Sequence, residues 1–174
     1  MDWAEFIKTT FMSLYTVILA VVCLYGFHRY VLVCLFYRHR KKKSYPAGTF
    51  ADLPRVTVQL PMYNERFVAR RIIEAACDLD YPADKIQVQV LDDSTDDTQD
   101  IARELVEEKK QDGHDIEYIH RENRAGFKAG ALANGMKNAT GEYIVIFDAD
   151  FIPDAGFLKN TIHYFTDPGV CAVQ

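Results

Sequence analysis

Two aspartates after an apolar run are the residues in this sequence best suited to chemistry. Asp148 and Asp150 follow the strand-like run YIVIF and are separated by one alanine. Alternate residues of an extended backbone point to one side, so both carboxylates can face a common point, where they repel each other. Mg²⁺ or Mn²⁺ removes that repulsion and is typically held by one or two carboxylates plus substrate phosphates. We therefore expect a metal at Asp148 and Asp150; the alternative is a structural pair satisfied by backbone N–H groups.

A second group of polar residues follows an earlier strand-like run, RVTVQL. The motif there is PMYNE, and it contains Tyr63, Asn64 and Glu65. A tyrosine at a strand end offers a flat face to a nucleobase, and the asparagine and glutamate offer hydrogen bonds to the base edge. The alternative is an ordinary turn whose asparagine caps the next helix.

The third group, DDSTDDT, follows the run IQVQVL. Asp92 and Asp93 stand directly at the strand end, where a carboxylate can accept a ring N–H, as an acidic residue accepts from ribose in dinucleotide folds. Asp96 and Asp97 instead suit a helix N-terminus, where the macrodipole favours anions. A calcium loop is excluded because the required glycine and glutamate are not at the right offsets.

The fourth group lies in HRENRAGFKAGALANGM. Gly126 and Gly130 would let the backbone approach a ligand, and Arg124 and Lys128 supply charge for a phosphate near a helix start. The spacing is not that of a P-loop, because no Ser or Thr follows Lys128. A surface loop with solvated cations is the alternative.

Strand-like and helix-like segments alternate from residue 55 onward, which predicts an α/β fold with a mostly parallel sheet. We expect strands at 55–60, 86–91, 116–120 and 143–150, a further strand from 169, and helices at 67–79, 98–111, 128–139 and about 156–165. Ligands of such folds gather at the carboxyl ends of the strands. Four polar groups at that edge predict a pocket for a nucleoside diphosphate and a metal.

Residues 1–43 predict a membrane anchor. The run 11–27 carries no charge, and apolar residues resume after Arg29, so the block 11–36 is long enough to cross a bilayer. Cations at 38–43 follow the apolar run, which places the N-terminus outside and the rest in the cytoplasm. A cleaved signal peptide would have its basic residues first. Arg29 either marks the cytoplasmic boundary or snorkels. We expect an integral membrane protein of the inner or plasma membrane or the Golgi.

The remaining chain divides into a Pro- and Gly-containing linker at 44–54 and a domain at 55–174. Residues 44–174 hold 13 Lys/Arg against 23 acidic residues, whereas residues 1–43 hold seven against two. An acidic domain is a poor nucleic-acid binder, so we expect no nucleic acid as a partner. The four cysteines form no C-x-x-C pair, which argues against a disulfide framework or a zinc site.

The motifs PMYNE, DDSTDD, NRAGFKAGALANGM and FDADF, in this order and spacing, resemble the membrane-anchored, processive family-2 glycosyltransferases, and within them the cellulose-synthase-like and β-mannan (glucomannan) synthase branch. The resemblance covers about residues 55–174. It implies a Rossmann-like GT-A fold, Mg²⁺ or Mn²⁺, a UDP-glucose or GDP-mannose donor, a polysaccharide acceptor and inversion at the anomeric carbon.

Carried over by residue, the resemblance puts Tyr63 and Asn64 beside the base, with Glu65 nearby, and gives Asp92 or Asp93 the base ring. Lys128 would then approach the diphosphate, Asp148 the donor sugar or ribose as well as the metal, and Asp150 the metal.

The resemblance is incomplete on the acceptor side. Family members continue with a T-E-D-type base and a Q-x-x-R-W motif, whereas the one tryptophan here is Trp3. We therefore expect an N-terminal donor-binding part of an incomplete GT-A domain, without its general base and inactive alone. Two other hypotheses are a non-catalytic, membrane-tethered nucleotide-sugar-binding fragment and a haloacid-dehalogenase phosphatase. The phosphatase class carries its D-x-D on the first strand of its core, not the fourth.

Overall fold

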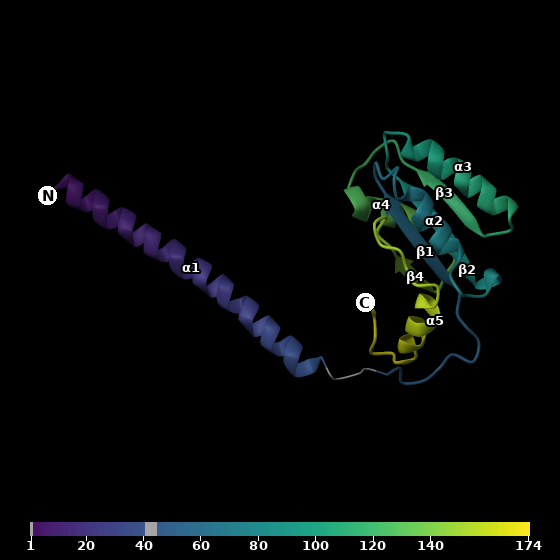
Figure 1. The fold of residues 1–174 in the computed structure, drawn as a ribbon, viewed down its shortest axis with the longest axis horizontal. Helices are drawn as coiled ribbons and strands as arrows, with labels where there is room; N and C mark the ends of the chain where they lie inside the picture. Colours follow the sequence, from purple (N-terminus) through teal and green to yellow (C-terminus); the bar gives the residue numbers. More distant parts are fainter. Residues whose placement is uncertain (1, 41–44) are drawn as a thin grey trace. The chain divides into compact units, whose positions relative to one another are not determined.

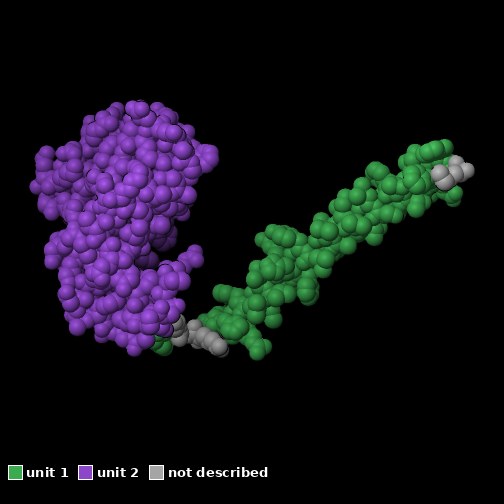
Figure 2. Space-filling view, turned by 180° about the vertical axis from the view of Figure 1, so that it is seen from behind, with its two compact units in different colours: residues 1–45 green, residues 46–174 purple. Residues whose placement is uncertain are grey.

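A computed structural model describes residues 2–40 and 45–174, which form two units, 1–45 and 46–174 (Figure 2). The cations at 41–43, on which the cytoplasmic assignment partly depends, lie outside the described residues.

The first unit is one long helix, α1 (Trp3–His39), of 37 residues. Asp2 caps its N-terminus by accepting a hydrogen bond of 3.2 Å from the backbone N–H of Ala4. None of its residues is buried, although most are apolar, and it is the one described helix long and apolar enough to cross a membrane. At about 1.5 Å per residue it exceeds the roughly 30 Å of a bilayer core. It runs through Arg29 without a break, so the polar interruption does not end the helix.

The second unit is built on a four-stranded parallel sheet with the order β3-β2-β1-β4 (Figure 1). The strands are β1 (Val56–Met62), β2 (Ile86–Asp92), β3 (Ile116–His120) and β4 (Tyr143–Ile146). The α/β class with a parallel sheet is thereby confirmed. Because all four strands run the same way, their carboxyl ends lie at one edge.

The two faces of the sheet differ in chemistry. One face carries Leu60 and the valines of β1 and β2, and these pack with buried residues of α2 (Ala69–Cys77) and α3 (Thr98–Gln111). The other face carries Gln59 and Gln89, joined by a buried hydrogen bond of 3.0 Å under α4 (Phe127–Gly135). Because side chains alternate along a strand, neighbouring residues at a strand end enter different environments.

The last helices are the short α5 (Phe157–Thr161) and η2 (Ile162–Thr166). A further short helix, η1 (Ala83–Lys85), precedes β2. The predicted strand from residue 169 is wrong, because residues 170–174 pair with no described strand and Val170 instead closes a turn onto Asp167 O at 3.0 Å. The predicted strand 143–150 is too long. It ends at Ile146, and a turn in which Phe151 N donates to Asp148 O at 2.9 Å takes over.

Candidate donor-binding site

A cavity of about 350 Å³ lies at the carboxyl ends of β1 and β2 and beside the start of α4. Its walls combine carboxylates, cations and one aromatic ring. They are formed by Pro61, Met62, Tyr63, Glu65, Asp93, Arg124, Lys128, Ala131, Asp148, Ala149 and Asp150. All four polar groups singled out in the sequence therefore contribute to one cavity, but Asn64 and Asp92 are not among the lining residues.

The aspartate pair lies in the turn after β4, and both carboxylates line the cavity. The Asp148 carboxylate forms an ion pair with the Lys128 ammonium, and both side chains are about half exposed. Among the described residues, no backbone N–H donates to the Asp148 or Asp150 carboxylate. The arrangement therefore differs from a structural pair satisfied by the backbone.

The donor set around Asp148 and Asp150 suits a hard divalent cation. The described residues contain no cluster of three or more His, Cys, Asp or Glu side chains that could hold a metal alone. Mg²⁺ and Mn²⁺ need no such cage, because they accept one or two carboxylates and complete their shell with phosphate oxygens and water. The residues present thus fit an ion that binds together with a diphosphate.

One face of the expected base platform is occupied by a cation. The Arg124 guanidinium carbon lies 3.3 Å from the centre of the Tyr63 ring and 5.2 Å from that of Phe127. Arg124 Nε is buried and has no hydrogen-bond partner in the described part of the chain. A planar base can extend this stack, since guanidinium and aromatic faces both accept a stacked ring.

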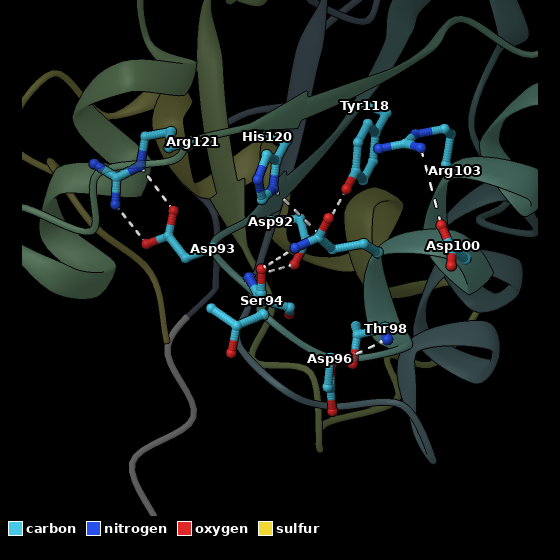
Figure 3. A network of polar contacts seen from close by, with 12 residues as sticks. Asp92, Asp93, Ser94, Asp96, Thr98, Asp100, Arg103, Tyr118, His120 and Arg121 are labelled. Carbon is cyan, nitrogen blue, oxygen red and sulfur yellow. Dashed lines mark hydrogen bonds and ion pairs between the residues drawn. The ribbon is translucent and has the colours of Figure 1, made fainter.

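The neighbouring aspartates at the end of β2 have opposite orientations (Figure 3). Asp93 lines the cavity on the α4 side, and Arg121 holds both of its oxygens, from Nε at 2.8 Å and from a terminal nitrogen at 2.5 Å. This pairing raises the pKa of the Arg121 guanidinium. Asp92 is fully buried on the opposite side of the strand. Asp93 is thus the one of the two that can reach a ligand in this cavity.

Asp92 is the centre of a buried polar network (Figure 3). Its Oδ2 accepts a hydrogen bond of 2.7 Å from the Tyr118 hydroxyl and lies 3.7 Å from His120 Nδ1. Its Oδ1 accepts from the backbone N–H of Ser94 at 2.9 Å. Burial, followed by the hydrogen bond to Asp92, raises the pKa of Tyr118, so the phenol stays protonated and donates. Asp92 thereby fixes the loop after β2.

That loop is tied to the turn after β1. Ser94 Oγ accepts from the backbone N–H of Asn64 at 2.8 Å, and Asn64 Oδ1 accepts from Thr95 N at 2.9 Å. Asn64 has a positive φ of 56°, a conformation that asparagine tolerates better than most residues. It does not cap the next helix, whose N-cap is Val68. Asn64 therefore ties the turn that carries Tyr63 to the loop after β2.

Asp96 and Asp97 were both expected to suit the N-terminus of the next helix, and only Asp96 makes a hydrogen bond there. Asp96 Oδ1 accepts from the backbone N–H of Thr98 at 3.0 Å, in the first turn of α3. Hydrogen bonding with Thr98 lowers the pKa of Asp96. Asp97 stands at the N-cap position but makes no capping hydrogen bond, and lies 3.7 Å from Arg66 instead.

The turn that starts α4 is strained and tightly packed. Gly126 and Phe127 both have positive φ, of 73° and 49°. A Cβ on Gly130 would lie 2.0 Å from the carbonyl oxygen of Ala125. The close approach of its own turn therefore requires glycine at position 130, in addition to the predicted approach of the backbone to a ligand.

Sequence reasoning missed Arg121 and Tyr118. Arg121 stands directly after β3, and strand ends are where ligand-facing residues gather in such folds, so this rule could have found it. Tyr118 lies inside β3, where an aromatic residue predicts only packing. Its pairing with Asp92 depends on the register of β2 and β3, in which Val90 lies opposite Tyr118 and Asp92 opposite His120.

Comparison with known proteins identifies close relatives. Residues 57–174 match the family model described as glycosyl transferase family 2. A probable glucomannan 4-beta-mannosyltransferase 9 of Oryza sativa subsp. japonica is 46% identical over 136 residues, which is 74% of this chain and 25% of the relative. A glucomannan 4-beta-mannosyltransferase 1 of Cyamopsis tetragonoloba is 39% identical over 169 residues, 93% of this chain and 30% of the relative.

A solved structure agrees with these relatives. The mannosyltransferase PcManGT from Pyrobaculum calidifontis, in complex with GDP-Man and Mn²⁺, aligns with a TM-score of 0.70 and 33% identity over 86% of this chain and 44% of that one. This chain spans about a quarter of the length of the first two curated relatives it matches, 25% and 24%.

Proposed function

Because the chain belongs to glycosyltransferase family 2, we propose that it forms the donor site of a membrane-anchored hexosyltransferase that binds GDP-mannose with a divalent cation. The single observation that carries this proposal is the convergence of Tyr63, Asp93, Lys128, Asp148 and Asp150 on one cavity. The aromatic face of Tyr63 and the paired carboxylate of Asp93 suit the base of such a donor, and the Lys128 ammonium suits its diphosphate. The exposed carboxylates of Asp148 and Asp150 suit the metal that binds with the donor.

GDP-mannose is favoured over UDP-glucose by three observations. The curated relatives of up to 49% identity are named as mannosyltransferases, and the structural neighbour PcManGT holds GDP-Man. The Asp93 carboxylate has about four acceptor sites, of which Arg121 uses two. Two sites remain for adjacent N–H groups on a base edge, which guanine presents and uracil does not.

The cation would be held by Asp150 and Asp148 with oxygens of the diphosphate. Its chemistry there is to stabilise the negative charge that develops on the leaving diphosphate. The PcManGT complex with Mn²⁺ supports a divalent metal. Lys128 lies in the first turn of α4 and pairs with Asp148, so its ammonium can stay with Asp148 or turn to a phosphate oxygen.

The proposed reaction inverts the anomeric carbon, as the family resemblance implies. The oxygen of an acceptor hydroxyl bonds to C1 of the mannose, the C1–O bond to the diphosphate breaks, and its electron pair goes to the β-phosphate of GDP. The hydroxyl proton goes to a general base on the acceptor side. The relatives' names suggest the 4-hydroxyl of a β-linked glucomannan as acceptor. We assign the carboxylates around the cavity to the donor, so the base lies outside this site.

The membrane anchor is proposed to be α1, with the catalytic domain in the cytoplasm. Its apolar side chains are exposed along its length, and Arg38 and Arg40 stand at its C-terminal end. Cations beside a span favour the cytoplasmic side. Both the plasma membrane and the Golgi membrane present a cytoplasmic face.

Direct titration of the purified chain in detergent micelles with Mn²⁺ tests the proposed donor. We expect GDP-mannose to bind more tightly than UDP-glucose, and Tyr63→Ala to weaken GDP binding by about 1–3 kcal/mol because a stacking face is lost. Phe67→Ala, an exposed aromatic that does not line the cavity, is the control. Tighter binding of UDP-glucose would overturn the mannose assignment, and binding of neither would overturn the site.

A further inference from the structure

Arg121 links two parts of the cavity wall, Asp93 and the turn before α4, by hydrogen bonds from one side chain. Its Nε and one terminal nitrogen hold Asp93 at the end of β2. The same terminal nitrogen also donates to the carbonyl oxygen of Phe127 at 3.1 Å, and the other donates to that of Ala125 at 3.3 Å. One guanidinium thus joins the carboxylate at the proposed base end to the turn that leads into Lys128.

The pair is largely withdrawn from water. The side chain of Arg121 is 14% exposed and that of Asp93 4%. Charge-assisted, bidentate hydrogen bonds in such a setting are among the strongest in proteins and fix orientation as well as distance. Asp93 therefore presents its remaining lone pairs to the cavity in one direction.

The turn that Arg121 holds is strained. Phe127 adopts a φ of 49°, which costs a non-glycine residue free energy that the surroundings must offset. Arg121 donates to the carbonyl groups of Ala125 and Phe127, which lie on either side of Gly126. The left-handed residues of the turn are Gly126 and Phe127. These contacts stabilise the turn and so set where α4 begins. They thereby also position Lys128, which lies in the first turn of α4.

We propose that Arg121 is a positioning residue for the nucleotide, resting on the proposed donor function: it fixes the separation between the base-facing Asp93 and the phosphate-facing Lys128. Arg121 does not line the cavity itself and acts through the groups it holds. A ligand that spans both ends, such as GDP, depends on that separation, whereas inorganic pyrophosphate, which reaches only the phosphate end, does not.

The chain offers a matched control at the opposite edge of the sheet. Arg55, just before β1, makes three comparable side-chain bonds: to Thr140 Oγ1 at 2.9 Å, to Asp84 O at 2.8 Å and to Asp115 Oδ2 at 2.5 Å. It too joins segments that are distant in the sequence, but it is remote from the cavity lining. Lysine keeps the charge at either position and loses the planar fork.

The experiment measures Mn²⁺-dependent binding of GDP and of pyrophosphate by the full chain in micelles, together with the thermal midpoint. We expect Arg121→Lys and Arg121→Gln to weaken GDP binding about tenfold or more, with pyrophosphate binding changed less than about threefold. Arg55→Lys should lower the thermal midpoint and leave both affinities unchanged.

Each other outcome decides against one part of the account. If wild-type protein binds GDP and the Arg121 variants bind it equally well, or if Arg55→Lys loses as much affinity, the positioning role is overturned and the donor site stands. If both Arg121 variants fail to fold while Arg55→Lys folds, Arg121 is a residue of the core fold and the proposal is wrong. If wild-type protein binds no GDP, the donor function itself fails, and this inference with it.

Discussion

The Tyr118 hydroxyl donates a hydrogen bond of 2.7 Å to Oδ2 of the fully buried Asp92. A buried carboxylate that loses a hydrogen-bond partner keeps its desolvation cost. Removing the Tyr118 hydroxyl is therefore expected to lower the free energy of unfolding by more than the loss of one small group would.

Tyr118→Phe should lower the free energy of unfolding by about 1–3 kcal/mol, because one lone pair of Asp92 is left without its donor. Scanning calorimetry of the chain in detergent micelles measures the change. Tyr143→Phe is the matched control, since its ring packs against Phe165 and its hydroxyl makes no hydrogen bond within the described residues. Equal effects of the two substitutions would show that the Asp92 network contributes nothing to stability.

Stability should decline at alkaline pH. Burial raises the pKa of the Cys77 thiol from 9.0 to about 11 and that of the Tyr81 phenol from 10.0 to about 12. The folded state therefore keeps these protons to higher pH than the unfolded state does. Their stabilising contribution is complete below about pH 9 and is lost as the pH rises toward 11 and 12.

Calorimetry between about pH 8 and pH 11 tests this decline. Tyr81→Phe, which also removes the hydrogen bond of 2.6 Å to Pro54 O, should lower stability at neutral pH and make the alkaline decline shallower. A thermal midpoint that is constant over this range would contradict the pKa shifts of both groups.

Gly135→Ala should destabilise the domain by about 1–3 kcal/mol, because added volume in a close-packed contact forces neighbours to move. The Cβ added at position 135 would lie 2.6 Å from Gln59 Nε2 and 2.8 Å from Leu91 Cδ2, where α4 packs on the sheet. Gly48→Ala is the control, with its nearest neighbour at an ordinary 3.6 Å. Thermal midpoints that fall by the same amount in both variants would refute the close packing under α4.

The orientation of the anchor is open to a labelling experiment. In a background without the native cysteines, at positions 23, 34, 77 and 171, Ser44→Cys should be protected from an impermeant thiol reagent added to intact cells. The positive-inside bias of the cations around residue 44 is the reason. Trp3→Cys at the other end of α1 should react under the same conditions. Labelling of residue 44 in intact cells would reverse the topology.

Much of the fold follows from the sequence because local pattern and burial agree. The strands at 86–91 and 116–120 and the helix at 98–111 lie within a residue of those observed. The strand from 169 fails for a physical reason: an apolar run becomes a strand only when a neighbour supplies hydrogen bonds, which a one-dimensional pattern does not reveal. The same limit applies to residues 147–150, where a turn replaces the end of β4.

The site was predictable at the level of strand ends and less so at the level of individual side chains. Alternation along β2 separates Asp92 from Asp93, and the period-two rule applied to Val88, Val90 and Asp92 could have assigned Asp92 to the core face. The stacking of Arg124 on Tyr63 could not have been predicted, because it depends on how two loops distant in the sequence meet.

Metal-linked binding of GDP at Asp150 is the most direct test of the donor site. Titration of the purified chain with GDP in Mn²⁺ should give an affinity that Asp150→Asn lowers by about tenfold or more, since the charge facing the ion is lost. Asp154→Asn, outside the cavity lining and able to keep its hydrogen bond of 2.9 Å from Gly156 N, should bind like the wild type. With EDTA in place of Mn²⁺, the Asp150 variant and the wild type should bind GDP equally weakly. Undiminished affinity in EDTA, or in Asp150→Asn with Mn²⁺, would contradict a metal held by this aspartate pair.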